Sequence, residues 1–410
     1  MSHRHIRWGV VVAFAALACV ACGPPECRPS PVHLPSAPDT LDWVGDGYAT
    51  VEARTGEVTL ALLLDTGFSQ TAIRQSLVTQ FNLAALELDL GATHVGPMIA
   101  GLLAVDGIDG VIGAETLHQL PLRFDARART TDILAGFEPA IDGAADLIVL
   151  APNRCRNDAA PNGPADPFAF LVQADIEGTP VTLILDTGAS ATFIRSDIFD
   201  TLTQRPTLSN LRIGSGFSGA FVATATRART FTVGNGTSEN QLVIAAPEVD
   251  AELDRLGALF DQAKPASMEG PLRMDGFLGW TFLREFKVSL AEGASATNGR
   301  TLSLERFDTQ THWRREFQGI GIYRVPSGPG EPSGIKVDGF LSNSPARDVG
   351  MREGDIITKV NGEPVGGFDP IVFTGLTATF EVQRNEGDAA NPMWTTMTFT
   401  VAWRDLLPDP

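Results

Sequence analysis

The chain has 410 residues, of which 43% are hydrophobic and 20% charged, a composition typical of folded domains and long enough for about two to four of them. Its net charge is −18, and no basic stripe stands out, which argues against a nucleic-acid-binding protein. The 41 glycines and 27 prolines predict frequent turns and therefore an all-β-dominated fold with many short strands.

The N-terminus predicts an exported protein. Arg4 and Arg7 precede an apolar run over residues 8–20, which is shorter than a typical transmembrane span. The run ends in Ala-Cys-Val-Ala-Cys-Gly, which resembles a bacterial lipobox with Cys22 as the lipidated residue. A plain cleaved signal peptide is the alternative. We expect a signal segment over 1–22, a tether over 23–45, and a location in the periplasm or cell envelope, anchored to a membrane by lipid.

Two further cysteines, Cys27 and Cys155, lie in polar, proline-rich segments. An oxidising compartment would allow them to form a disulfide, and two free thiols is the alternative. The one CxxC spacing, Cys19 to Cys22, belongs to the signal segment; no Cys/His cluster accompanies it, and the six histidines are scattered. It therefore predicts neither a metal site nor a cofactor.

An internal repeat organises the middle of the chain. Residues 48–74 and 169–195 align without a gap at an offset of 121, and each copy predicts a β-hairpin that ends in Asp-Thr-Gly. Identical residues include Asp65 and Asp186, Thr66 and Thr187, Gly67 and Gly188, Ser69 and Ser190, Thr71 and Thr192, and Arg74 and Arg195.

A second pair of matching segments follows the first in each half. Residues 109–117 (DGVIGAETL) and 275–283 (DGFLGWTFL) each hold two apolar residues between glycines, and a short predicted strand comes next. Two ordered matches predict two similar halves, over residues 46–140 and 166–292. The intervening stretch 141–165 is rich in Ala, Asp, Asn and Pro and is predicted to be a linker.

The two Asp-Thr-Gly loops and their glycine partners resemble the pepsin-like and retroviral-type aspartic peptidases, over about residues 45–292. The resemblance implies two pseudo-symmetric β lobes that each donate one aspartate, Asp65 and Asp186, to a shared site. Two carboxylates held close share a proton, because ionising both is costly. One can then act as a base on a bridging water while the other acts as an acid toward a peptide carbonyl.

The resemblance also assigns roles to three further pairs of loop residues: Thr66 and Thr187, Gly67 and Gly188, Ser69 and Ser190. The threonines would hydrogen-bond across the axis between the lobes. The glycines would let the backbone turn tightly behind each aspartate. The serines would bond the outer carboxylate oxygens.

Only the second half has room for a flap, since the stretch between the aspartate and its glycine partner is roughly half as long in the first half. The candidate is a glycine-tipped hairpin over residues 211–225 that contains Gly214, Gly216 and Gly219. It has no tyrosine, which pepsin-like flaps commonly have, and Phe68 stands where a small residue is more usual. These departures leave a degenerate peptidase open.

After a second expected linker over 293–316, residues 317–405 resemble a PDZ domain, a β-rich α+β fold, of the bacterial protease-associated kind. The motifs are GIGI at 319–322 and SPARDVGMREGDIITKVNGEPV at 344–365, in which Ser344 is placed to cap a helix. The resemblance implies that a peptide's terminal carboxylate binds the loop formed by Gly319, Ile320, Gly321 and Ile322. The peptide itself would add as a strand to the sheet edge. A PDZ domain that packs on the peptidase and binds no free peptide is the alternative.

Together these features predict a membrane-tethered aspartic endopeptidase that cleaves peptides or proteins, with a PDZ domain that recruits substrate tails or regulates access. A catalytically inactive, peptide-binding lipoprotein is the first alternative. The second keeps the enzyme but pairs like halves between two chains.

Overall fold

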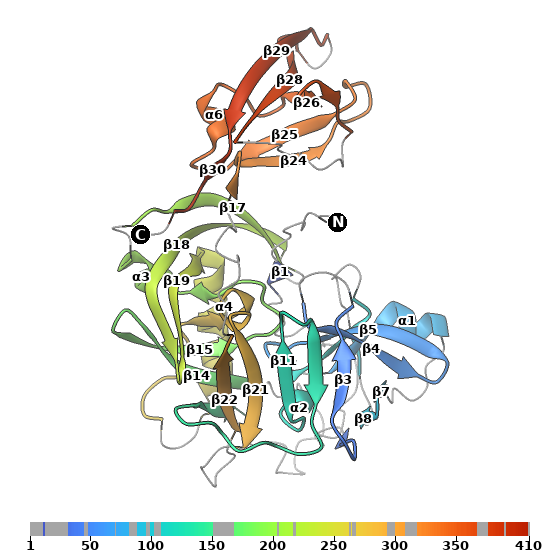
Figure 1. Cartoon of the computed structure of the whole chain (residues 1–410), viewed down its shortest axis with the longest axis vertical. Helices are drawn as coiled ribbons and strands as arrows, with labels where there is room; N and C mark the ends of the chain where they lie inside the picture. The colour runs from blue at the N-terminus through green and yellow to red at the C-terminus, as the bar shows by residue number, and fades with distance from the viewer. Residues whose placement is uncertain are drawn as a thin grey trace.

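The structure of this chain is a computed structural model, and strands dominate it, as the sequence predicts (Figure 1). The described residues are 11–12, 32–44, 48–69, 71–81, 88–95, 99–101, 108–150, 168–202, 205–215, 219–261, 264, 268–292, 300–307, 318–366, 376–388 and 391–408.

The largest sheet has 14 strands and takes strands from both predicted halves. In sheet order they are β1 (Val11–Val12), β17 (Leu208–Ser215), β18 (Gly219–Val233), β19 (Gly236–Ala245), β16 (Phe193–Ile194), β20 (Gly276–Leu278), β15 (Thr179–Leu185), β14 (Ala169–Ile176), β13 (Ala145–Leu150), β22 (Arg300–Arg306), β21 (Phe286–Glu292), β11 (Leu122–Asp125), β12 (Thr130–Ile133) and β3 (Asp39–Asp42).

A second sheet of eight strands belongs to the N-terminal part of the chain. Its order is β2 (Val32–His33), β8 (Thr93–Val95), β7 (Leu88–Leu90), β4 (Thr50–Thr55), β5 (Val58–Leu64), β10 (Gly110–Ile112), β6 (Ala72–Arg74) and β9 (Ile99–Gly101). Five helices accompany the two sheets: α1 (Gln75–Phe81), α2 (Ala114–Leu117), α3 (Ser196–Asp200), α4 (Pro247–Phe260) and α5 (Trp280–Leu283). None of the helices within the described ranges is long and apolar enough to cross a bilayer.

The sequence repeat is also a repeat of strand pairing. In the first copy, β10 runs parallel to β5 with Gly110 opposite Leu62. In the second, β20 runs parallel to β15 with Gly276 opposite Leu183, which is the equivalent register. Both glycines are needed for close backbone approach, because a Cβ on Gly276 would lie 2.0 Å from the carbonyl oxygen of Phe193.

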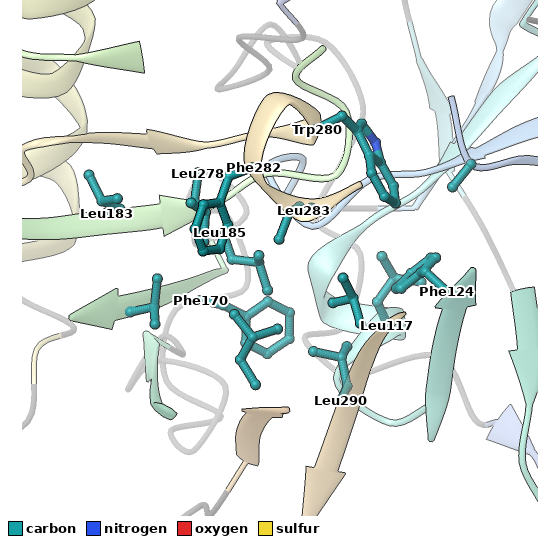
Figure 2. Packing of buried hydrophobic residues seen from close by; sticks show 14 of the residues in the cluster. Leu117, Phe124, Phe170, Leu183, Leu185, Leu278, Trp280, Phe282, Leu283 and Leu290 are labelled. Atoms are coloured by element: carbon teal, nitrogen blue, oxygen red, sulfur yellow. The ribbon is translucent and has the colours of Figure 1, made fainter. Parts of the chain in front are cut away.

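One buried cluster joins the two copies (Figure 2). Trp280 belongs to it, with its ring edge-to-face with Trp43 at 5.3 Å and with Phe124 at 6.1 Å between centroids. Such pairs stabilise beyond the area that they bury. Leu183 and Leu185 of β15 lie in the same cluster, so the strand that leads to Asp186 ends in a dry, packed environment.

Three segments expected outside the folded halves contain strands instead. Within the predicted linker 141–165, β13 pairs with β14 and β22, and Leu147 and Leu150 are buried. Within the predicted linker 293–316, β22 pairs with β21 along its whole length. Within the predicted tether 23–45, β3 pairs with β12 at the edge of the large sheet. Polar and proline-rich neighbours hid these short strands in the sequence. The partners of β3, and the pairing of β13 with β22, are distant in sequence, whereas β22 also pairs with its sequence neighbour β21.

The C-terminal domain has its own six-stranded sheet and its own buried core. Its strands are β24 (Ile322–Pro326), β25 (Ile335–Phe340), β26 (Ile356–Val360), β28 (Thr377–Asn385) and β29 (Trp394–Ala402), with β27 (Glu363–Pro364) paired to β26. The short helix α6 (Pro345–Asp348) begins at Ser344, whose Oγ accepts from the Arg347 N–H at 3.2 Å, as the sequence predicts. A two-stranded pairing of β23 (Gln318–Gly319) with β30 (Arg404–Asp405) closes the domain.

Candidate active site

Two equivalent strands deliver the two aspartates. Asp65 follows β5, and its N–H donates to the Ile112 carbonyl at 3.0 Å; Asp186 follows β15, and its N–H donates to the Leu278 carbonyl at 3.0 Å. Each aspartate is thus attached to the apolar-apolar-Gly segment of its own repeat. The sequence repeat therefore places both carboxyls by the same local geometry.

The threonines of the two loops hold them against each other. The Thr66 hydroxyl donates to the Leu185 carbonyl at 2.8 Å and accepts from the Thr187 N–H at 3.0 Å. The Thr187 hydroxyl donates to the Leu64 carbonyl at 2.7 Å and accepts from the Thr66 N–H at 3.0 Å. These are the hydrogen bonds expected across the axis, and all four are buried.

This arrangement places each carboxyl directly behind the glycine of the opposite loop. A Cβ on Gly67 would lie 2.4 Å from Cγ of Asp186, and a Cβ on Gly188 would lie 2.2 Å from Oδ2 of Asp65. Such distances are too short for any side-chain atom. Glycine at both positions is therefore a condition for bringing the two carboxyls together.

Backbone N–H groups hold one oxygen of each carboxyl. Oδ1 of Asp65 accepts from Gly67 at 2.8 Å and Phe68 at 3.2 Å. Oδ1 of Asp186 accepts from Gly188 and Ala189, both at 2.9 Å. The two Oδ2 atoms are fully buried and receive no N–H or hydroxyl donor from the described residues. The two Oδ2 atoms are therefore the carboxyl oxygens that can still form a further hydrogen bond.

Burial and mutual repulsion favour the protonated forms. Burial raises the pKa of Asp65 to about 6, although the hydrogen bonds from Gly67 and Phe68 oppose the shift. Burial, and then the charge of Asp65, raise the pKa of Asp186 well above its usual range. Over an interval above about pH 6 the pair therefore holds one proton. A pair in this state offers one base and one acid.

The expected serine bonds are absent. Neither Oδ2 atom accepts a bond from Ser69 or Ser190, and the buried Ser190 Oγ has no partner among the described residues. The expectation was wrong because backbone N–H groups occupy Oδ1 of each aspartate, and the hydroxyls do not reach Oδ2.

Further threonines support the loops and were not singled out from the sequence. The Thr71 hydroxyl accepts from the Gly113 N–H at 3.0 Å and lies 2.6 Å from that of Thr116. In the second copy, Thr192 Oγ1 accepts from the Gly279 N–H at 3.2 Å. Thr71 and Thr192 occupy equivalent positions of the repeat, which was the signal that could have found them.

The indole of Trp280 is a second support that sequence reasoning missed. Its Nε1–H donates to the Thr187 carbonyl at 2.6 Å, so the aromatic cluster holds the Asp186 loop directly. The corresponding residue after the first glycine segment is Ala114, which offers no such donor. The two loops are therefore supported differently.

The candidate flap is a hairpin of β17 and β18. Ser215 pairs with Gly219, and Gly214 pairs with Ala220. Gly216, at the expected tip, lies outside the described residues, as do Cys22, Cys27 and Cys155. Among the residues that the structure describes, no group of three or more His, Cys, Asp or Glu is arranged to hold a metal ion.

The expected carboxylate-binding loop lies at one edge of the C-terminal sheet. Gly319 belongs to β23, Ile320 is buried, and the Ile320 carbonyl accepts from the Ser344 hydroxyl at 2.7 Å. Gly321 has a left-handed φ of 68°, and a Cβ there would lie 2.8 Å from Cα of Ser344. Ile322 opens β24, which among the described strands of this sheet pairs only with β25.

Comparisons with known proteins match two parts of the chain. Residues 172–282 match the family model described as an aspartyl protease, and residues 337–373 match the model described as a PDZ domain. Among solved structures, the HtrA3 PDZ domain bound to a phage-derived ligand matches at 29% identity, over 21% of this chain and 85% of that chain, with a TM-score of 0.18. No curated protein matches the chain.

Proposed function

We propose that this chain, which contains an aspartyl protease domain and a C-terminal PDZ domain, is an aspartic endopeptidase. The observation that carries the proposal is the pair of buried carboxyls, Asp65 and Asp186, which equivalent loops place side by side. The raised pKa of each favours a state in which the pair shares one proton. The family match covers the second repeat only, so the role of Asp65 rests on the geometry.

The chemistry follows from that protonation state. The ionised carboxyl removes a proton from a water whose oxygen attacks the peptide carbonyl carbon. The protonated carboxyl donates its proton to the carbonyl oxygen, giving a tetrahedral diol. When the C–N bond breaks, the nitrogen takes up the proton that the first carboxyl removed from water. One hydroxyl of the diol returns a proton to the second carboxyl, which leaves a carboxylic acid and the pair in its starting state. The dry surroundings of both aspartates strengthen these electrostatic effects.

We propose further that the two repeats form the two lobes of a single active site within one chain. The four hydrogen bonds between the Asp-Thr-Gly loops join residues of the same polypeptide, which favours this arrangement over pairing between two chains. Specific activity that stays constant on dilution of a monomer, with the mass checked by sedimentation, would support it. Activity that falls with dilution would favour pairing between chains.

A peptide-binding protein without peptidase activity is the second candidate. It is favoured by one observation: both aspartates are completely buried, with 0% exposure of each. A substrate would need the loops or the hairpin to open before it could reach Oδ2. Measurable affinity for peptides with no cleavage would support this second candidate.

For the PDZ domain we propose that a peptide with a free terminal carboxylate binds the Gly319–Ile322 loop and adds along β24. The free edge of β24 and the left-handed Gly321 support this assignment. Titration with a pool of octapeptides that have random last four residues, beside the same pool with amidated ends, tests it. Equal binding of both pools would contradict it.

We propose that the chain is exported and lipid-anchored at Cys22, on the strength of its N-terminal sequence alone. Labelled fatty acid that appears in the wild-type protein and not in Cys22→Ser, in a bacterial host, is the expected result. Equal labelling of both proteins would remove Cys22 from the proposal.

The first test of function is cleavage of casein between pH 3 and 8 by wild type, Asp65→Asn and Asp186→Asn. A matched control is Asp254→Asn, because Asp254 is exposed on α4 and lies far from the pair in sequence. Wild type and the control should cleave and the two active-site variants should not. Cleavage that persists in both Asp65→Asn and Asp186→Asn would end the proposal.

A further inference from the structure

Strand β17, the first strand of the candidate flap, contains an irregularity. Its pairing with β18 shifts register between Leu208 and Leu211, which leaves Ser209 and Asn210 without partners on β18. Asn210 has a left-handed φ of 63°. A bulge of this kind leaves backbone groups to be satisfied by something other than the neighbouring strand.

The PDZ domain supplies those partners. The Tyr323 hydroxyl donates to the Asn210 carbonyl at 2.9 Å and accepts from the Arg212 N–H at 2.7 Å. The Ser342 hydroxyl accepts from the Ser209 N–H at 3.0 Å, and the Ser342 N–H donates to the Ser209 carbonyl at 3.3 Å. The PDZ domain thus bonds both backbone groups of Ser209, the Asn210 carbonyl and the Arg212 N–H.

A charged contact reinforces the same place. The guanidinium of Arg212 forms an ion pair with the Asp338 carboxylate, and its Nη2 donates to the Asp338 carbonyl at 2.8 Å. The same guanidinium lies 4.9 Å from the centre of the Tyr323 ring. Figure 1 shows β24 and β25, which contribute Tyr323 and Asp338, next to β17.

The hairpin is in turn packed toward the Asp186 loop. Ile213 of β17 and Phe221 of β18 belong to one buried cluster with Ala191 and Phe193, which follow the loop directly. The Phe221 and Phe193 rings lie 6.4 Å apart. These packed side chains would therefore transmit a shift of β17 to the segment that follows Asp186.

From these contacts we propose that Tyr323 and Asp338 of the PDZ domain are positioning residues for the peptidase site. They hold the bulge of β17 and thereby set the position of the β17–β18 hairpin relative to the Asp186 loop. The PDZ domain is then a structural part of the candidate flap as well as a peptide-binding module. The catalytic half of this inference rests on the proposed peptidase function.

The test compares Tyr323→Phe, which removes only the hydroxyl, and Asp338→Asn with wild type. Asp348→Asn is the matched control, because Asp348 forms a similarly exposed ion pair with Arg404 inside the PDZ domain and, among the described residues, makes no hydrogen bond to β17. Two measurements are made on the full chain: amide hydrogen exchange over residues 208–225, and kcat, KM and pH profile on casein.

We expect amides 209–213 to exchange about tenfold faster in Tyr323→Phe, because this variant loses both hydrogen bonds of the hydroxyl, to the Asn210 carbonyl and from the Arg212 N–H. We expect kcat to fall by a similar factor while the pH profile and the melting temperature stay unchanged. The control should match wild type in both measurements. A merely structural role would lower the melting temperature instead.

If amides 209–213 exchange at the same rate in Tyr323→Phe and wild type, the proposal that Tyr323 fixes the β17 bulge is overturned. Faster exchange with unchanged kcat would overturn the catalytic half. If wild type cleaves nothing, the peptidase proposal fails, and the exchange experiment still decides whether the PDZ domain sets the hairpin.

Discussion

Thr66 and Thr187 each donate a hydroxyl to the strand that ends at the other repeat's aspartate, so each aspartate is held in place by the opposite loop. Each hydroxyl also accepts an N–H from the opposite threonine. The two halves of the site consequently depend on each other. Neither loop can move without breaking buried bonds of both.

Thr66→Val removes one donor and one acceptor from this buried network while nearly keeping the side-chain volume. We expect a loss of about 2–4 kcal/mol in the free energy of unfolding, because two buried hydrogen bonds lose a partner. Thr66→Ser keeps the hydroxyl and should lose less than half as much. Urea denaturation measures both, and equal losses would show that the methyl group matters more than the bonds.

Gly67→Ala would place a methyl group 2.4 Å from Cγ of Asp186. Because the two loops are held together by four buried bonds, we expect them to be forced apart, with a loss of several kcal/mol and of casein cleavage. Gly136→Ala is the control, since its added Cβ meets nothing within 4 Å. Cleavage at the wild-type rate by Gly67→Ala would mean that the loops have more room than the structure shows.

Ser190→Ala removes a buried hydroxyl that has no partner among the described residues. Removing an unpaired polar group is neutral or stabilising, so the melting temperature should stay the same or rise by a few degrees. A clear drop would indicate that the hydroxyl is hydrogen-bonded after all, as the family resemblance implied.

The raised pKa of Asp65 makes stability depend on pH in a definite direction. A carboxyl whose pKa rises from 3.8 to about 6 on folding binds its proton more tightly in the folded state. Its contribution is present in full below about pH 4 and is lost as the pH rises through about 6, by about 3 kcal/mol. Asp65→Asn should show less of this loss than Asp254→Asn, in denaturation measured at pH 4 and pH 7.5.

The same pKa directions set the pH dependence of cleavage. At low pH both aspartates are protonated and no base is present, so kcat/KM should rise as the pH passes about 6. It should fall again only where Asp186 loses its proton, because its pKa is raised further by burial and by Asp65. Initial rates between pH 3 and 8 measure this profile. Maximal activity at pH 3–4 would contradict it.

The sequence predicted the residues of the candidate site more completely than it predicted which segments form strands of the sheets. Asp65, Asp186 and their glycine partners followed from a repeat whose local geometry is the same in both copies, and local patterns are what sequence reasoning detects best. The strands β13 and β22 were assigned to linkers, since they pair with each other across a long stretch of chain and this pairing has no local signal. The local pairing of β22 with β21 was missed as well. The prediction that Ser69 and Ser190 bond the aspartates was wrong, because such a bond depends on the exact position of each hydroxyl relative to Oδ2, which the sequence does not give.

Thr192 illustrates a different kind of miss. It was visible as an identical position of the repeat, yet its contact with the Gly279 N–H depends on how the glycine segment folds back beside the loop. No pattern in the sequence indicated the hydrogen bond from the Tyr323 hydroxyl to the Asn210 carbonyl in the bulge. Contacts between domains of one chain are not recorded in the motifs of either.

The described residues that follow the PDZ sheet pack against the β17–β18 hairpin. Leu406 and Leu407 are buried in the same cluster as Leu211 and Phe221, and the Leu407 carbonyl accepts from Arg227 Nε of β18 at 3.1 Å. In the sequence, the PDZ domain therefore lies between two segments that are packed into the rest of the protein: β22 before it, and Leu406 and Leu407 after it. Attachment at both ends, together with the contacts of Tyr323, Ser342 and Asp338 with β17, restricts the orientations of the PDZ domain more than a single tether would.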